Sequence, residues 1–245
     1  MRVLVVYAHH NPESFTHAVL EQVTRGLADA GHEFEVLDLY SIGFNPVFTQ
    51  HDGAQFVHHT TPAQLLDRGM LEQAILDSAG NPLKRMMAKR WLRGKSVPDI
   101  VRMFEQNRPA DVREHQAKVA QAQGLVFIAP VFWMGFPAIL KGWMERVFAY
   151  GCAYTLNSGG WAGNLDGRIP LLTQGKGLII TPTFFTKDEY DTGWRDAMDT
   201  ILCDWSLKMA GVRETEHVYF YAAFAVGAET RAEYLQEAYR LGKEY

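Results

Sequence analysis

The sequence predicts an α/β protein built on a doubly wound parallel sheet. Two observations carry this prediction: short apolar runs that suit strands covered on both faces, and amphipathic stretches between them that suit crossover helices. Strands and helices alternate along the chain, as expected for a parallel sheet wound by helices. Ligands bind such sheets beyond the carboxyl ends of the strands, so the residues after each strand are the first candidates for a site.

Five strands are predicted, at residues 3–8, 34–39, 125–129, 178–181 and 217–224. The first, third and fourth runs are continuously apolar, whereas the fifth is aromatic and more amphipathic. Helical periodicity is clearest where Val19, Val23 and Leu27 recur at four-residue spacing before Gly31, which suits a helix end. The predicted helices cover residues 15–30, 109–123, 137–148, 191–210 and 228–243.

The chain of 245 residues is predicted to form a single domain over residues 1–245. Two stretches exceed a minimal five-stranded unit and are interpreted as insertions, at about 43–108, with helical patches at 62–78 and 81–92, and at 157–177. The net charge of −4 predicts no nucleic-acid partner, and no apolar run predicts membrane insertion. Two cysteines outside any CxxC pair, and an N-terminus unlike a signal peptide, favour the cytoplasm.

The loop after the first strand suits a phosphate group. A helix follows it directly, and helix N-termini present unpaired N–H groups and a positive dipole end. His9, Ser14 and Thr16 add side-chain donors. Helix capping by Asn11 or Ser14 explains the same residues without a ligand. No GxGxxG motif is present, which disfavours a standard dinucleotide site.

The loop after the third strand suits a flat heteroaromatic ring. It places a proline, two aromatic residues and a glycine between a buried strand and a helix, so that backbone amides and the indole of Trp133 can lie along a ring. The alternative is that Phe132 and Trp133 are core residues at a tight turn.

Residues 130–148 resemble the signature of the NAD(P)H:quinone oxidoreductases, the family of DT-diaphorase and the modulators of drug activity. The matching positions are Pro130, Trp133, Gly135, Pro137, Ala138, Leu140, Lys141, Gly142, Trp143, Glu145, Arg146 and Val147. The first loop is similar at His9, Ser14 and Phe15, with Thr16 where the family usually has Asn. Further likeness occurs at residues 39–40, 44–46 and 153–155, so the resemblance covers the sheet scaffold from residue 1 to about 155, excluding the insertion at about 43–108.

The resemblance implies a flavodoxin-like fold, with five parallel strands in the order 2-1-3-4-5 and helices on both faces. The residues between strands 2 and 3 are interpreted, from their own helical patches, as a helical insertion. The resemblance also implies a bound flavin, FAD with FMN as the alternative, and a homodimer with its site at the subunit interface. Tyr154 would close the substrate side from the other subunit. The implied flavin contacts are His9, Ser14, Phe15, Thr16, Pro130, Val131, Phe132, Trp133, Met134 and Thr181.

The chain departs from the family after the fourth strand. Where Thr-Thr-Gly-Gly is usual, this sequence continues from Thr181 to Phe184 and Phe185, which we expect to line and narrow the acceptor pocket. Tyr190 lies near the position of a family tyrosine that stabilises reduced flavin, and it is the second catalytic candidate beside Tyr154. No histidine accompanies it; Trp194 and Arg195 are nearest.

The predicted activity is a two-electron hydride transfer from NADH or NADPH, through the flavin, to a quinone or similar aromatic acceptor. The alternatives are reduction of azo compounds, nitroarenes or free flavin, and a flavin-binding regulatory subunit of a transport system. No metal site is predicted, because the histidines at positions 9, 10, 51, 58 and 59 show no ligand spacing with a carboxylate or cysteine.

Overall fold

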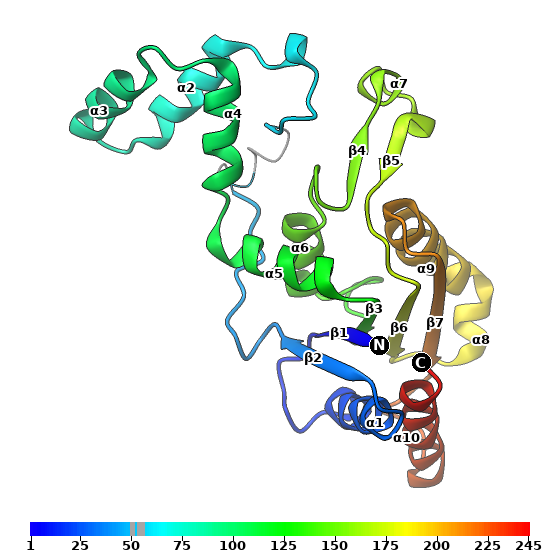
Figure 1. The fold of residues 1–245 in the computed structure, drawn as a ribbon. Helices are drawn as coiled ribbons and strands as arrows, with labels where there is room; N and C mark the ends of the chain where they lie inside the picture. Colours follow the sequence, from blue (N-terminus) through cyan, green and yellow to red (C-terminus); the bar gives the residue numbers. More distant parts are fainter. Residues whose placement is uncertain (50–51, 53–56) are drawn as a thin grey trace. The chain divides into compact units, whose positions relative to one another are not determined.

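The computed structural model describes residues 1–49, 52 and 57–245. Its contacts divide the chain into two compact units, one of residues 1–47 and 114–245 and one of residues 48–113. Each unit is described by itself below (Figure 1). This division does not test the prediction of a single domain with insertions, which stays a prediction.

The first unit contains a five-stranded sheet whose strands are all parallel. The order is β2-β1-β3-β6-β7, which is 2-1-3-4-5 when only the strands of this sheet are counted. The sheet agrees with the predicted doubly wound arrangement, with strand ends shifted by up to four residues. The strands are β1 Arg2–Tyr7, β2 Glu33–Asp38, β3 Gly124–Ile128, β6 Lys176–Pro182 and β7 Glu214–Phe220.

Helices α1 (Phe15–Asp29) and α10 (Ala228–Lys243) lie side by side on one face of the sheet (Figure 1). Val19, Val23 and Leu27 of α1 are fully buried in the core between these helices and the strands. The two helices approach closely at Gly26, where a Cβ atom would lie 2.2 Å from the carbonyl oxygen of Tyr239. The helices can therefore approach this closely only because Gly26 has no side chain.

The opposite face of the sheet is covered by α5 (Ala110–Gln121), α6 (Ala138–Val147) and residues 187–208. Trp143 of α6 is fully buried, and its indole N–H donates to Nδ1 of His115 at 3.1 Å. A parallel sheet with both faces covered explains why its central strands are continuously apolar.

The prediction of one continuous helix at residues 191–210 is wrong. The segment consists of α8 (Lys187–Glu189), the π-helix η4 (Tyr190–Trp194), α9 (Arg195–Asp199) and a second π-helix, η5 (Thr200–Lys208). Gly193 adopts a φ of 122°, a left-handed conformation that breaks the regular hydrogen-bond ladder.

Residues 154–170 form a small hairpin that the sequence did not predict. Strands β4 (Tyr154–Leu156) and β5 (Arg168–Pro170) pair antiparallel around α7 (Ser158–Trp161) and the 3₁₀ turn η3 (Leu165–Gly167). Strands of three residues are too short to show a periodic pattern.

The second unit contains the 3₁₀ turn η2 (Ala63–Leu65) and helices α2 (Arg68–Ser78), α3 (Pro82–Leu92) and α4 (Val97–Gln106). Leu71, Leu92 and Ile100 form its small buried core. The sequence patterns indicated α2 and α3 but missed α4, which begins with a capping box between Ser96 and Asp99. Among the described residues, no helix has the length and apolar character needed to span a membrane.

Candidate functional site

Three loops meet where β1, β3 and β6 end. Ala8 donates a backbone hydrogen bond to Ile128 at 3.0 Å, and Val131 donates to Pro182 at 3.3 Å. Parallel strands bring their carboxyl ends to one edge, so loops more than a hundred residues apart in the sequence become neighbours. This edge carries most of the residues for which the sequence predicts a role.

The loop after β3 turns sharply at Trp133 and Met134. Phe132 and Gly135 exchange backbone hydrogen bonds of 2.9 and 3.2 Å, and the two residues between them have φ values of 45° and 66°. Left-handed backbone costs a residue with a side chain about 1–2 kcal/mol. The indole of Trp133 is 100% exposed and Phe132 is 40% exposed, so the tight turn is present but neither side chain belongs to the core.

An aromatic pocket of about 360 Å³ lies against this turn. Its lining comes from the loop after β3, the loop after β6 and the helical segment that follows: Val131, Trp133, Met134, Phe184, Phe185, Tyr190 and Trp194. The rings of Phe185 and Tyr190 each contact Trp194 edge-on, at centroid distances of 5.7 and 5.9 Å. The structure thus brings together six residues with predicted roles and Trp194.

Tyr190 is almost fully buried behind this pocket, in contact with Tyr219 and Tyr221 at ring distances of 5.5 Å. Burial raises the pKa of its hydroxyl, and the nearby Tyr221 raises it further. The hydroxyl therefore stays protonated at neutral pH and can donate a hydrogen bond. Its catalytic role stays a prediction.

The loop after β1 holds its first histidine in place. His9 is buried, and its Nδ1 lies 3.0 Å from both the backbone nitrogen and the backbone oxygen of Asn11. Its ring stacks on His10 at 4.6 Å and lies 6.4 Å from the ring of Phe132. Burial lowers the pKa of His9, so the ring is neutral at pH 7.

Helix α1 begins at this loop, with Ser14 as its N-cap. The Ser14 hydroxyl accepts from the N–H of His17 at 3.1 Å, which leaves the N–H groups of Phe15 and Thr16 without partners inside the helix. The Phe15 side chain packs on Phe220 and Thr16 is buried. Phe15 and Thr16 therefore offer their backbone N–H groups, rather than their side chains, to the loop after β1.

Thr181 belongs to a buried polar network that the sequence did not predict. Its hydroxyl lies 2.8 Å from Nε2 of His217, and Nδ1 of His217 lies 2.7 Å from the carboxylate of Asp199. The Tyr219 hydroxyl donates to the same carboxylate oxygen at 2.7 Å. The Thr181 side chain is therefore engaged within the fold, and its predicted flavin contact stays a prediction.

Tyr154 is not among the residues that line the aromatic pocket. It lies on β4, where the guanidinium of Arg168 stands 4.3 Å from its ring centroid and the ring of Tyr150 lies 5.9 Å away. Burial raises the pKa of its hydroxyl, against the opposing effect of Arg168. Its predicted action from a second subunit is not tested by a single chain.

The chain matches the model of a protein family described as having a flavodoxin-like fold, over residues 1–242. It is 30% identical over 187 residues to a ribosyldihydronicotinamide dehydrogenase [quinone] of Mus musculus, covering 76% of this chain and 67% of that protein. It is 32% identical over 154 residues to NAD(P)H dehydrogenase [quinone] 1 of Cavia porcellus, covering 63% of this chain but only 45% of that protein.

A solved NAD(P)H:quinone oxidoreductase from Methanothermobacter marburgensis superposes with a TM-score of 0.71 at 25% identity, covering 100% of this chain and 96% of the other. The family match thus spans nearly the whole sequence, and this solved relative shares the fold. The chain therefore belongs to the flavodoxin-like family of NAD(P)H:quinone oxidoreductases.

Proposed function

We propose that this protein is a flavin-dependent oxidoreductase that passes two electrons, as hydride, from NADH or NADPH through a bound flavin to a quinone or similar flat aromatic acceptor. One observation carries the proposal: a left-handed turn exposes Trp133 and Met134 beside an aromatic pocket at the carboxyl ends of the strands. Strained backbone of this kind concentrates at active sites and ligand-binding sites.

The residues at this edge fit the two ends of a flavin. A flat ring suits the exposed indole of Trp133 and the backbone of residues 130–134, and a phosphate suits the free N–H groups of Phe15 and Thr16 at the start of α1. His9 connects the two regions, since its ring lies 6.4 Å from that of Phe132 and its Nδ1 lies 3.0 Å from the backbone of Asn11, in the loop before α1. These groups come from neighbouring strands, so one ligand can contact both.

A bound flavin would supply the hydride chemistry, accepting two electrons from the nicotinamide and passing them to the acceptor. The protein would orient the reactants and exclude water from them. Phe184 and Phe185 form an apolar wall that favours a flat aromatic molecule. Tyr190 would donate a hydrogen bond from its protonated hydroxyl where negative charge develops.

The finer parts of the proposal follow the family resemblance: FAD rather than FMN, a homodimer in which Tyr154 completes the partner's pocket, and a cytoplasmic location. Chromatography of the cofactor released by denaturation separates FAD from FMN. Light scattering of the intact protein gives its mass, and a monomer with full activity would contradict the role of Tyr154.

The proposal is tested by the visible spectrum of the purified protein during anaerobic addition of NADPH or NADH, followed by a benzoquinone. We expect flavin bands that bleach without a semiquinone and return when quinone is added. A protein that is colourless and binds neither FAD nor FMN would overturn the proposal. Azo, nitro and free-flavin acceptors tested alongside would identify a different preferred substrate, and slow turnover with all of them would favour a regulatory subunit.

The site within the protein is tested by Trp133→Ala, which should weaken flavin retention because it removes the exposed stacking surface. Trp205→Ala is the matched control, since Trp205 is a half-exposed indole outside the pocket lining. Equal flavin content in the two variants would show that the turn is merely structural.

A further inference from the structure

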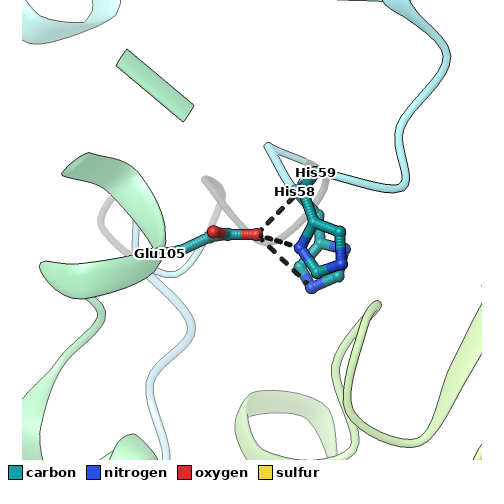
Figure 2. Close-up of side chains that lie close together, drawn as sticks. All are labelled: His58, His59 and Glu105. Carbon is teal, nitrogen blue, oxygen red and sulfur yellow. Dashed lines mark hydrogen bonds and ion pairs between the residues drawn. The ribbon is translucent and has the colours of Figure 1, made fainter. Parts of the chain in front are cut away.

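A second cluster of chemistry-bearing side chains lies within residues 48–113, apart from the residues assigned above. His58 and His59 converge on one carboxylate oxygen of Glu105, at the end of α4 (Figure 2). That oxygen, Oε1, lies 3.5 Å from Nε2 of His58 and 2.9 Å from Nδ1 of His59. Three atoms of the types that ligate transition metals therefore meet at one point.

Neighbouring groups orient these three side chains. Nδ1 of His58 lies 2.8 Å from the hydroxyl of Thr60 and accepts from the backbone N–H of Thr60 at 3.3 Å, and these contacts orient the ring so that Nε2 points toward Glu105. The backbone N–H of His59 donates to Oε1 of Glu105 at 2.9 Å. The side chains of His58 and Glu105 are only 13% and 25% exposed, so the pair is held largely out of solvent.

We propose that His58 Nε2, His59 Nδ1 and Glu105 Oε1 form a site for a divalent transition-metal ion of the Zn²⁺ class. Tetrahedral Zn²⁺ with bonds of about 2.0–2.1 Å needs donor atoms about 3.3 Å apart; the two separations from Oε1 are 2.9 and 3.5 Å, and all three donor atoms lie within 4.8 Å of one another. Two nitrogens and one oxygen favour Zn²⁺ over Ca²⁺ or Mg²⁺, which take oxygen ligands. The sequence predicted no metal here, because Glu105 is distant from the histidines in the chain.

Three protein ligands leave one position of a tetrahedral ion open for water or a small ligand. His59 and Glu105 also line a pocket of about 380 Å³, whose apolar walls include Leu66, Val97 and Val101. The largely apolar pocket thus lies beside the proposed ion. A small ligand could enter there without disturbing the three protein ligands.

One other group of metal-ligating residues occurs among the described residues, and it does not suit an ion. Asp199, Cys203 and His217 lie close together, but they offer a single imidazole, whose ring nitrogens contact Asp199 and Thr181. Burial raises the pKa of the Cys203 thiol to about 11, which keeps it protonated. The cluster at Glu105 instead directs two imidazoles at one carboxylate oxygen and contains no thiol.

The test is calorimetric titration of ZnCl₂ into the full-length, tag-free protein after EDTA treatment and dialysis, with bound metal counted by mass spectrometry. We expect one Zn²⁺ per chain. Glu105→Gln, which keeps the shape but removes the charge, and His59→Ala, at a largely exposed position, should each weaken binding at least about tenfold. His32→Ala is the matched control and should bind as the wild type does.

Far-UV circular dichroism and flavin content monitor the fold of each variant. Because His59 is largely exposed, its variant keeps the test meaningful if Glu105→Gln unfolds. Absence of Zn²⁺ binding to the wild type would overturn the proposal. Binding that persists in both folded variants would also overturn it and would direct attention to His9 and His10.

Discussion

The hydroxyl of Thr181 lies 2.8 Å from Nε2 of His217, and this contact joins the carboxyl end of β6 to the neighbouring strand β7. Asp199 extends the link, because its carboxylate contacts both His217 and Tyr219 at 2.7 Å. Phe184 follows Thr181 by three residues, in the loop that begins after Pro182. The network therefore anchors the strand from which one wall of the aromatic pocket extends.

This network predicts a pH dependence of stability. Burial lowers the pKa of His217 in the folded chain, so the unfolded chain binds a proton more readily. The free energy of unfolding should therefore fall as the pH drops below about 6.5, by at most about 1.4 kcal/mol per pH unit for this residue. At higher pH both states are neutral at this residue and the contribution is constant.

Urea unfolding at pH 5.5, 6.5 and 7.5 measures this effect. His217→Gln should flatten the loss of stability at low pH, whereas His10→Gln, at an exposed position, should leave the slope as in the wild type. Identical slopes in His217→Gln and wild type would show that His217 does not carry the dependence.

The sheet could be predicted from the sequence because its strands are buried on both faces and therefore continuously apolar, as at residues 125–129. Helix α1 was equally clear from its spaced apolar residues. The break at Gly193 could not be predicted, because a glycine within a helical pattern does not show by itself that its φ will be 122°.

The site was predictable where its residues are consecutive. Residues 130–134 form one motif, and the resemblance placed them together. The contact of Asp199 with His217, and that of His59 with Glu105, join residues 18 and 46 positions apart. A local sequence pattern cannot predict such contacts, because only the fold of the intervening chain brings the two residues together.

The left-handed turn at Trp133 and Met134 predicts that relieving its backbone strain will raise stability and lower flavin affinity. Met134 has a φ of 66°, where glycine is free of the strain borne by a side chain. Met134→Gly should therefore raise the free energy of unfolding by about 0.5–1 kcal/mol, offset partly by the greater freedom of the unfolded chain. Flavin affinity should fall, because the side chain lines the pocket.

Urea unfolding of the flavin-free protein measures the stability change, and flavin titration measures the affinity. Met70→Gly is a control, as Met70 is an exposed helical methionine and its replacement should destabilise by about 1 kcal/mol. A destabilised Met134→Gly would indicate that contacts of the side chain outweigh the backbone strain.

The close packing of α1 on α10 predicts a costly substitution at Gly26. A Cβ there would lie 2.2 Å from the carbonyl oxygen of Tyr239 and 2.7 Å from the backbone nitrogen of Lys243, so the helices must separate. Gly26→Ala should cost about 1–3 kcal/mol of stability, although alanine favours helix formation. Glu21→Ala, on the exposed side of α1, should change stability by less than about 0.5 kcal/mol. Chemical denaturation compares the two, and similar stabilities would show that the helices adjust freely.

The phenylalanines after β6 predict a restriction on acceptor size. Phe184 lines the aromatic pocket and packs edge-on against Phe185 at 5.3 Å, in the place where the family usually has glycine. Phe184→Gly removes a wall of the pocket, so kcat/KM for a bulky naphthoquinone should rise about tenfold relative to that for a small benzoquinone.

Phe224→Gly provides the matched control for this substitution. Phe224 contacts Phe184 at 6.2 Å but does not line the pocket, so its loss should change the ratio between acceptors much less. Steady-state rates with both quinones at a fixed NADPH concentration give the two ratios. If both variants keep the wild-type ratio, the loop after β6 does not restrict the size of the acceptor. If both ratios rise equally, the restriction belongs to the whole aromatic cluster, because removing either ring loosens the other.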